Sequence, residues 1–187
     1  IFTPKTLAIV EQLTEMAWQL PYSIRVDSVT NYQHTIAEED DLLVDNLISD
    51  ALNKTTKELA YAKHVALNEP SIAGRLISKN ADVTAINISM ELPGIKPDET
   101  PEVSKASYKI QAYLKDKYPE VEVYLTGQII TDNAFKDAAI YDLTHIVPLA
   151  FLIAICCIAI YMFVASGSVI TLFSGTFATF IIILTSI

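Results

Sequence analysis

The sequence predicts an α+β domain followed by transmembrane α-helices, and two observations support this prediction. The 13 basic and 22 acidic side chains all lie in residues 1–142, whereas residues 143–187 contain no Asp, Glu, Lys or Arg. Residues 1–130 alternate between helical and strand-like patterns of apolar side chains. We therefore expect an acidic, water-soluble part and a membrane-embedded tail.

Residues 3–20 are predicted to form the first helix. Thr3 is a favoured N-cap residue, and Pro4 is favoured at the first helical position. The apolar side of this helix is expected to consist of Ile9, Leu13, Met16 and Leu20. Pro21 ends the helical pattern, and residues 24–30 then alternate with a period of two, which predicts a strand.

Two more strands and one helix are predicted in the second half of the soluble part. Residues 84–92 alternate between apolar and polar side chains, a stronger strand pattern than the first. Residues 101–118 carry apolar side chains at helical spacing and end at Pro119. Residues 121–126 alternate again before Gly127, which predicts the last strand.

These elements follow one another in the order helix, strand, strand, helix, strand. One strand ahead of Thr3, with Ile1-Phe2 as its stub, would complete the order βαββαβ. We therefore expect residues 1–130 to form a ferredoxin-like domain of the split βαβ kind.

An insertion of about residues 36–80 separates the two middle strands. We expect a helix near residues 39–52 and a second helix opened by a capping box between Thr55 and Glu58. A hairpin around residues 76–82 is expected to lead into the next strand.

The acidic run Glu38-Glu39-Asp40-Asp41 is interpreted as the start of the first inserted helix. Acidic side chains in the first turn of a helix complement its dipole. A cation site is the alternative, but the run lacks the alternating spacing and the glycine of an EF-hand loop. The helix start is the favoured interpretation.

The membrane-embedded tail begins with a long apolar run. Residues 131–142 are expected to form a connecting helix that continues without Gly or Pro into a transmembrane helix at residues 143–165. Twenty residues from Ile146 span roughly 30 Å as a helix, which matches the hydrocarbon core of a bilayer. The continuity predicts a stiff connection between the soluble part and the membrane.

A second apolar run, residues 169–187, is expected to be the start of another transmembrane helix. Only residues 165–168 separate the two runs, so the helices must be antiparallel neighbours. Small residues recur every four positions; they are Gly167, Thr171, Gly175 and Thr179. Either this stripe lets the helices approach closely, or it only reflects how common Gly and Thr are in membrane helices. The chain opens on Ile1 without Met and closes inside this run, so we expect a piece of a larger protein.

The sequence contains no pattern typical of an enzyme. It has no G-x-S-x-G, P-loop, C-x-x-C or H-E-x-x-H motif. His34, His64 and His145 are isolated, and a structural or surface role is expected for each. Cys156 and Cys157 are adjacent on a helix and point about 100° apart, which disfavours a metal pair or a disulfide. We therefore expect no catalytic, metal-binding or cofactor-binding residue.

Composition and hydrophobicity constrain the partners. The formal net charge of −9 argues against binding to nucleic acid and to anionic lipid surfaces. Six apolar residues form either a groove for a hydrophobic substrate or, more commonly, part of a core; they are Met16, Trp18, Leu42, Leu43, Leu47 and Ile48.

Several short segments occur in an order and spacing that resemble one transporter group. They are Phe2-Thr3-Pro4, Val26-Asp27-Ser28-Val29-Thr30-Asn31, Arg75-Leu76-Ile77-Ser78, Tyr124-Leu125-Thr126-Gly127-Gln128, Asn133-Ala134-Phe135, and Asp142-Leu143 before Val147-Pro148-Leu149. With these segments, essentially the whole chain resembles the RND superfamily, especially its MMPL-like exporters of hydrophobic molecules and lipids.

This resemblance implies that the chain is the first porter domain with the second and part of the third transmembrane helix. The porter domain would be periplasmic, and the protein would lie in the bacterial inner membrane. Intact relatives have two such halves and twelve spans, and export hydrophobic or lipidic molecules using the proton gradient. Their proton-relay residues lie on later helices, so none is expected in this sequence.

The implied partners are the lipid bilayer, a hydrophobic or lipid substrate, the remaining transmembrane helices and the second porter domain. A homo-oligomer is left open. Relatives often carry Arg or Lys in the loop after the second helix, whereas residues 165–168 contain neither, so charge bias gives no orientation here.

Two other classes of protein remain as alternatives. One is a membrane-anchored extracytoplasmic sensor or receptor domain, and the other is an RND-fold component of protein translocation or sterol sensing. A sensor would continue with a soluble signalling module, whereas a transporter would continue with more apolar spans.

Overall fold

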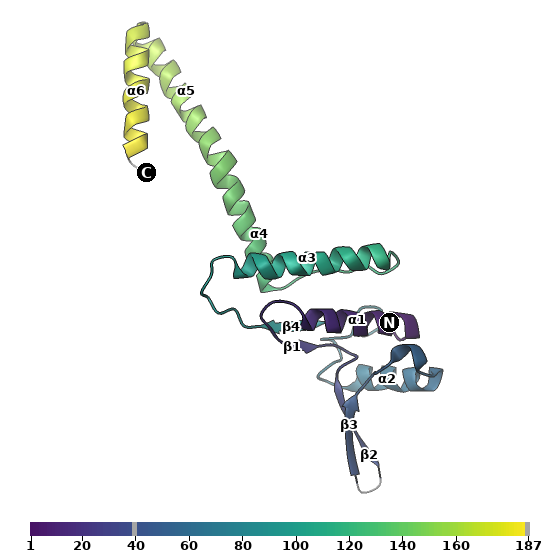
Figure 1. Cartoon of the computed structure of the whole chain (residues 1–187). Helices are drawn as coiled ribbons and strands as arrows, with labels where there is room; N and C mark the ends of the chain where they lie inside the picture. Colours follow the sequence, from purple (N-terminus) through teal and green to yellow (C-terminus); the bar gives the residue numbers. More distant parts are fainter. Residues whose placement is uncertain (39–40, 186–187) are drawn as a thin grey trace. The chain divides into compact units, whose positions relative to one another are not determined.

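The computed structural model describes residues 1–38 and 41–185, and it divides into two compact units, Ile1–Ile129 and Ile130–Ile187 (Figure 1). Unit 1 contains α1 (Pro4–Trp18), β1 (Ser23–Asp27), β2 (Gln33–Glu38), β3 (Asp41–Asn46), the short 3₁₀ turn η1 (Ala51–Asn53), α2 (Thr56–Asn68), β4 (Asn87–Met90) and α3 (Glu99–Lys117). The helices that follow are α4 (Gln128–Tyr141), the π-helical turn η2 (Asp142–Ile146), α5 (Val147–Ser166) and α6 (Val169–Thr185). The chain is thus mixed α and β.

Helix α1 begins where the sequence predicts. The Thr6 N–H donates to Thr3 Oγ1 at 3.2 Å, and Pro4 occupies the start of the helix. The buried residues of α1 are Leu7, Ile9, Val10, Thr14 and Ala17. Leu13 and Met16, predicted on the apolar side, are only half-buried. The buried side is rotated towards Leu7 and Val10, which belong to the main core.

The strands β1 and β4 form an antiparallel pair in which Val26 faces Ile88. Asn31 ends β1 because its side chain folds back: Nδ2 donates to the Val26 carbonyl at 2.7 Å, and Oδ1 accepts the Ser28 N–H at 2.7 Å. Both predicted middle strands therefore exist, and both are shorter than predicted.

The strand predicted at residues 121–126 is wrong, and Ile1-Phe2 form no strand either. In a split βαβ order the last strand pairs with the first, and the described residues ahead of α1 offer no such partner. The Val123 carbonyl instead accepts a hydrogen bond from Gln111 Nε2 of α3 at 2.7 Å. In the described part of unit 1, the sheets are therefore two pairs, β1 with β4 and β2 with β3.

The helix predicted near residues 39–52 is also wrong. Within that segment Asp41–Asn46 forms β3, which pairs antiparallel with β2 so that Thr35 faces Val44, and Ala51 begins the 3₁₀ turn η1. β-Branched residues favour such cross-strand pairs, and this pairing is invisible in the local sequence. Glu39 and Asp40 lie outside the described residues. Of the acidic run, Glu38 ends β2 and Asp41 begins β3, so neither of these two lies in the first turn of a helix.

The other predicted features of the insertion are present. At the start of α2, the Glu58 N–H donates to Thr55 Oγ1 at 3.3 Å and the Thr55 N–H donates to Glu58 Oε2 at 2.7 Å, which confirms the capping box. The hairpin predicted around residues 76–82 is present as an antiparallel bridge between Ile77 and Thr84.

The main core of unit 1 joins α1 to α2 and to the irregular segment after α2. It consists of Leu7, Val10, Val29, Ile48, Ala51, Leu59, Ala62, Ala66, Ile72, Ile77 and Ala81. Removal of these side chains from water is the dominant stabilising contribution in this unit.

A polar network joins α3 to α1 at the surface of unit 1. Gln12 Nε2 donates to Tyr113 Oη at 3.1 Å, and Tyr118 Oη donates to Gln12 Oε1 at 3.0 Å. Lys117 Nζ donates to Tyr113 Oη at 2.9 Å and lies 5.3 and 5.1 Å from the ring centroids of Tyr113 and Tyr118. The hydrogen bond to Tyr113 is the main cause of the raised pKa of Lys117. Both helices are thereby fixed by directional contacts as well as by burial.

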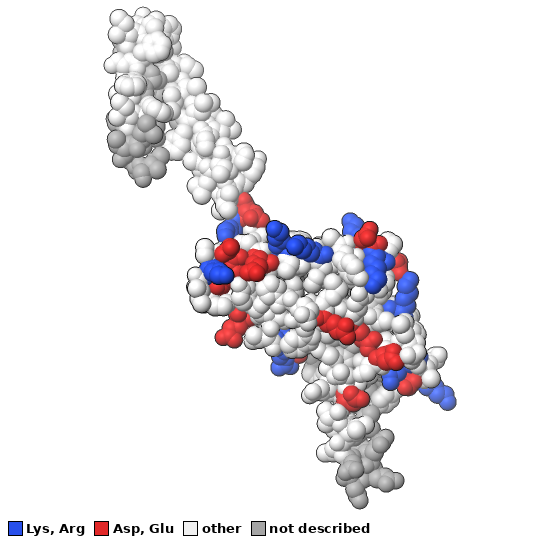
Figure 2. Space-filling model, in the orientation of Figure 1, with Lys and Arg blue, Asp and Glu red and all other residues white. Residues whose placement is uncertain are grey.

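Unit 2 contains an antiparallel pair of helices, α5 and α6 (Figure 1). Gly167 ends α5 with φ +60°, a left-handed conformation that glycine adopts without strain, and its N–H donates to the Phe163 carbonyl at 2.9 Å. The predicted antiparallel hairpin is confirmed. Figure 2 shows that the acidic and basic side chains lie outside these two helices.

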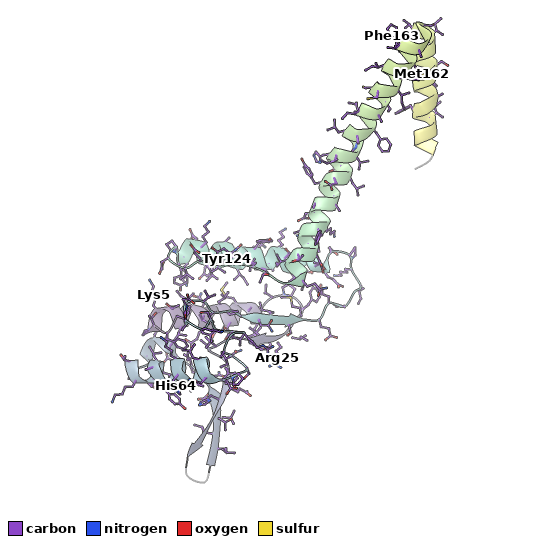
Figure 3. The ribbon with its side chains drawn as sticks, turned by 180° about the vertical axis from the view of Figure 1, so that it is seen from behind. Lys5, Arg25, His64, Tyr124, Met162 and Phe163 are labelled. Carbon is purple, nitrogen blue, oxygen red and sulfur yellow. The ribbon has the colours of Figure 1, made fainter. Side chains whose placement is uncertain are left out.

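The close helix approach expected from the small-residue stripe occurs at Gly175. A Cβ atom at this position would lie 2.9 Å from Cε of Met162, which is labelled on α5 in Figure 3. The side chains of Thr171 and Thr179 lie outside the described part of the structure. Glycine therefore permits this contact at one position of the stripe.

One continuous helix, Gln128–Ala165, is long and apolar enough to cross a membrane, and it is the one such helix among the described residues. Its 38 residues extend over about 57 Å at 1.5 Å per residue, well beyond the hydrocarbon core of a bilayer. The charged residues of its first part, Asp132, Lys136, Asp137 and Asp142, all precede the apolar run.

Candidate functional site at the start of the apolar helix

The passage from α4 to α5 contains the most unusual backbone geometry of unit 2. We call residues 141–148 the interfacial turn, because the last charged residue, Asp142, lies within it. The Val147 N–H donates to the Asp142 carbonyl, five residues back, so this part of the helix has a π-helical turn. Pro148 has no N–H, and its ring would crowd the Thr144 carbonyl in a regular helix. The turn relieves that conflict.

Side chains stabilise the interfacial turn. The rings of Tyr141 and His145 stack with centroids 4.6 Å apart and an interplanar angle of 15°. Thr144 Oγ1 donates to the Ile140 carbonyl at 2.7 Å and lies 2.7 Å from His145 Nδ1. These contacts provide hydrogen-bond partners for polar groups at the point where the regular i to i−4 hydrogen bonds of the helix are interrupted. The arrangement can act as a bend point in a long helix.

The structure does not bring the three predicted histidines together. His34 lies on β2, with Nε2 2.9 Å from Tyr61 Oη, and His64 lies exposed on α2 (Figure 3), whereas His145 lies in η2. Over residues 1–38 and 41–185, no group of three His, Cys, Asp or Glu side chains is placed to hold a metal ion.

The six apolar residues predicted as either groove or core are separated in the structure. Ile48 belongs to the main core and Leu47 packs against it. Leu42 and Leu43 lie exposed on β3, and Trp18 is exposed at the end of α1. These residues therefore form no common substrate groove in unit 1.

Sequence reasoning missed one buried carboxylate, Glu99 at the start of α3. Its side chain is 4% exposed and accepts the N–H groups of Gly94, Ile95 and Lys96 at 2.8, 2.9 and 2.9 Å. The hydrogen bond from the Lys96 N–H is the largest cause of the lowered pKa of Glu99, and the other two N–H groups act in the same direction. The sequence offered one signal for this contact: an acidic residue, Glu99, follows a few positions after the turn residues Pro93-Gly94.

A folded acidic unit and a long apolar helix with an antiparallel apolar neighbour are features typical of the membrane protein class. A family model described as the MMPL family matches residues 4–182. The chain therefore belongs to the MMPL family of RND-type membrane transport proteins, as its sequence segments predicted. No curated protein and no solved structure matches the chain.

Proposed function

We propose that the chain is part of an exporter that moves hydrophobic or lipidic molecules out of the cell, driven by the proton gradient. The observation that carries the proposal is the single family match over residues 4–182, which includes the soluble unit and most of both apolar helices. One continuous match supports a shared transport role for both parts, whereas a sensor domain on an unrelated anchor would not require it.

In this proposal, residues 1–130 are the first porter domain, with the insertion at about residues 36–80. The pair β1–β4, flanked in sequence by α1 and α3, would be the centre of a ferredoxin-like arrangement. Residues 131–142 would be the connecting helix. Residues 143–165 and 169–187 would be the second span and the start of the third, in the bacterial inner membrane with unit 1 in the periplasm.

The proposed mechanism is alternating access with movement of the porter domain coupled to the membrane helices. The helix Gln128–Ala165 supports this, because a helix without Gly or Pro before Pro148 transmits motion along its axis. The interfacial turn would be the place where that helix bends. Residues 143–187 contain no Asp, Glu, Lys or Arg, and the proton-relay residues would come from other helices of the parent protein.

A transport assay tests the proposal. The parent protein is reconstituted into liposomes with a fluorescent phospholipid, and movement of the phospholipid is followed after a proton gradient is imposed. We expect transport that an uncoupler abolishes. Equal movement with and without the gradient would contradict proton-driven export, and no movement in either condition would favour a sensor or receptor.

Labelling of single cysteines tests the proposed orientation. In a parent protein in which Cys156 and Cys157 are changed to Ser, Lys79→Cys in unit 1 should react with an impermeant maleimide added outside spheroplasts. Ser168→Cys should react only after the membrane is permeabilised. The reverse pattern would overturn the periplasmic assignment of unit 1.

A further inference from the structure

A groove of about 330 Å³ lies on unit 1 where the first turns of α1 and α2 meet. Its size is near the lower limit of small-molecule sites, which hold roughly 300–1,000 Å³. The residues that matter for its chemistry are four apolar side chains, Phe2, Pro4, Leu59 and Ala60, and two lysines, Lys54 and Lys63.

The groove has an apolar floor. Leu59 is buried in the main core and Phe2 packs against that core, so both are fixed in position. Pro4 and Ala60 are exposed beside them. Such a floor gains free energy when a short hydrocarbon chain covers it, by roughly 25 cal/mol for each Å² removed from water.

The charge of the groove is opposite to that of the chain. Residues 51–68 contain three lysines and one acid, Glu58, whereas the whole chain has a formal net charge of −9. Lys54 Nζ lies 3.3 Å from Glu58 Oε1, and the Glu58 carboxylate is also held by Thr55 in the capping box. The part of the chain that the structure describes gives Lys63 no hydrogen bond or ion pair. Lys63 therefore provides an uncompensated positive charge at the edge of an apolar surface.

We propose that this groove binds an anionic amphiphile, with its phosphate or carboxylate headgroup at Lys63 and Lys54 and a single hydrocarbon chain on the floor. A neutral amphiphile would leave the lysines unused, and a small inorganic anion would leave the floor uncovered. The starts of α1 and α2 both line the groove, and the start of α2 adds positive potential next to Lys54, which directly precedes its N-cap. The proposal deepens the proposed function, on which it rests, by naming a substrate class for one site in unit 1.

Photo-crosslinking tests the site directly. The probe is decyl phosphate with a diazirine on its chain, applied to the full-length parent protein in phosphatidylcholine nanodiscs, and labelled peptides are identified by mass spectrometry. We expect labels in residues 1–5 and 54–63, which unlabelled decyl phosphate removes by competition. Decyl maltoside and inorganic phosphate should each compete at least about tenfold less well, because each supplies only half of the interaction.

Two variants and one matched control sharpen the test. Lys63→Gln should lower labelling about tenfold, in line with the loss of a charge-assisted contact. Ala60→Phe should lower it by occupying the floor. Lys57→Gln removes the same charge from the same helix at a position that does not line the groove, and it should change labelling less than about twofold.

Three results would overturn the proposal. Equal competition by decyl maltoside would mean apolar binding alone, and equal competition by inorganic phosphate would mean an adventitious anion only. Equal losses in Lys63→Gln and Lys57→Gln would mean a diffuse charge effect. Because labelling is measured without a proton gradient, the groove can fail while gradient-driven transport remains, and transport can fail while labelling remains.

Discussion

The two units of the molecule are held together by different contacts. In unit 1, large apolar side chains such as Leu7, Ile72 and Ile77 are almost completely removed from solvent. In unit 2, no described residue is buried, and Ile160 and Val164 are 64% and 77% exposed. Burial stabilises a unit in water, whereas exposed apolar side chains cost nothing among lipid tails, where close packing between helices provides the contact energy. The same residue types therefore have different roles on either side of Asp142.

The largest effect is expected in the core of unit 1, where a substitution tests whether burial stabilises this unit. Leu7→Ala should destabilise unit 1 by about 2–5 kcal/mol, because it leaves a cavity where the side chain is fully buried. Hydrogen exchange of the α1 and α2 amides in the detergent-solubilised protein measures this change. The control Leu52→Ala, at an exposed position of the same unit, should change the stability by less than about 0.5 kcal/mol. Equal costs would mean that burial is not what stabilises unit 1.

In unit 2, a change in packing at Gly175 should have the next largest effect. Gly175→Leu should cost about 1–3 kcal/mol, because α6 must move away from α5. Gly175→Ala should cost much less, since the atom that it meets is the flexible end of Met162. Thermal unfolding in detergent compares the two variants with the native protein. An undisturbed Leu variant would show that close approach at this position does not stabilise unit 2.

The interfacial turn connects the charged part of the long helix to its apolar part, and a change there should have the third largest effect. Pro148→Ala restores an N–H that can donate to the Thr144 carbonyl, and a net hydrogen bond contributes about 1 kcal/mol. Amide protection around this turn should therefore rise about fivefold by hydrogen exchange in nanodiscs. Leu149→Ala, one residue later, keeps the proline and should leave the protection unchanged. A rise in both variants would mean that side-chain volume, and not the missing N–H, controls the turn.

The smallest effect concerns a charged side chain of the capping box in unit 1, Glu58. The hydrogen bonds from Thr55 lower the pKa of Glu58 to about 2, the one from its hydroxyl being the largest cause. This value lies below the ordinary carboxyl pKa, so the stabilisation is complete above about pH 4.5 and is lost as the pH falls towards 2. Exchange of the α2 amides against pH should show this loss.

Two variants control that pH dependence. Glu58→Gln should remove it, because the side chain no longer titrates, while α2 still forms. Lys54→Gln should keep it, since the lysine contributes less to the lowered pKa than Thr55 does. A pH profile in Glu58→Gln identical to that of the native protein would contradict the assignment to this capping box.

Local signals in the sequence predicted the parts of the fold that depend on neighbouring residues. Thr3-Pro4 and the box between Thr55 and Glu58 place two helix starts correctly, because each cap is satisfied within one turn. Residues 39–52 were predicted wrongly, because Asp41–Asn46 pairs as a strand with the preceding β2 and a helical pattern of apolar residues does not reveal this. Residues 121–126 were predicted wrongly, because a strand needs a partner strand, and local periodicity does not show whether one is present.

The same distinction applies to the candidate sites. The charge boundary at Asp142 predicted the start of the apolar helix, and Pro148 was visible, but the π-helical turn depends on carbonyl geometry. The groove at Lys63 combines residues about sixty positions apart, from Phe2 to Lys63, which only the packing of α1 on α2 brings together. Periodicity along the sequence does not predict which distant residues come together in this groove.

The pairing of β1 with β4 also affects when unit 1 can fold during synthesis. Asp27 faces Asn87, so β1 must wait for about sixty more residues before its partner exists. At 5–20 residues per second, the ribosome takes roughly 3–12 s to make them. Non-local pairs of this kind form late. The nascent β1 edge therefore remains open for seconds, and a chaperone that covers it over that interval would raise the yield of folded protein.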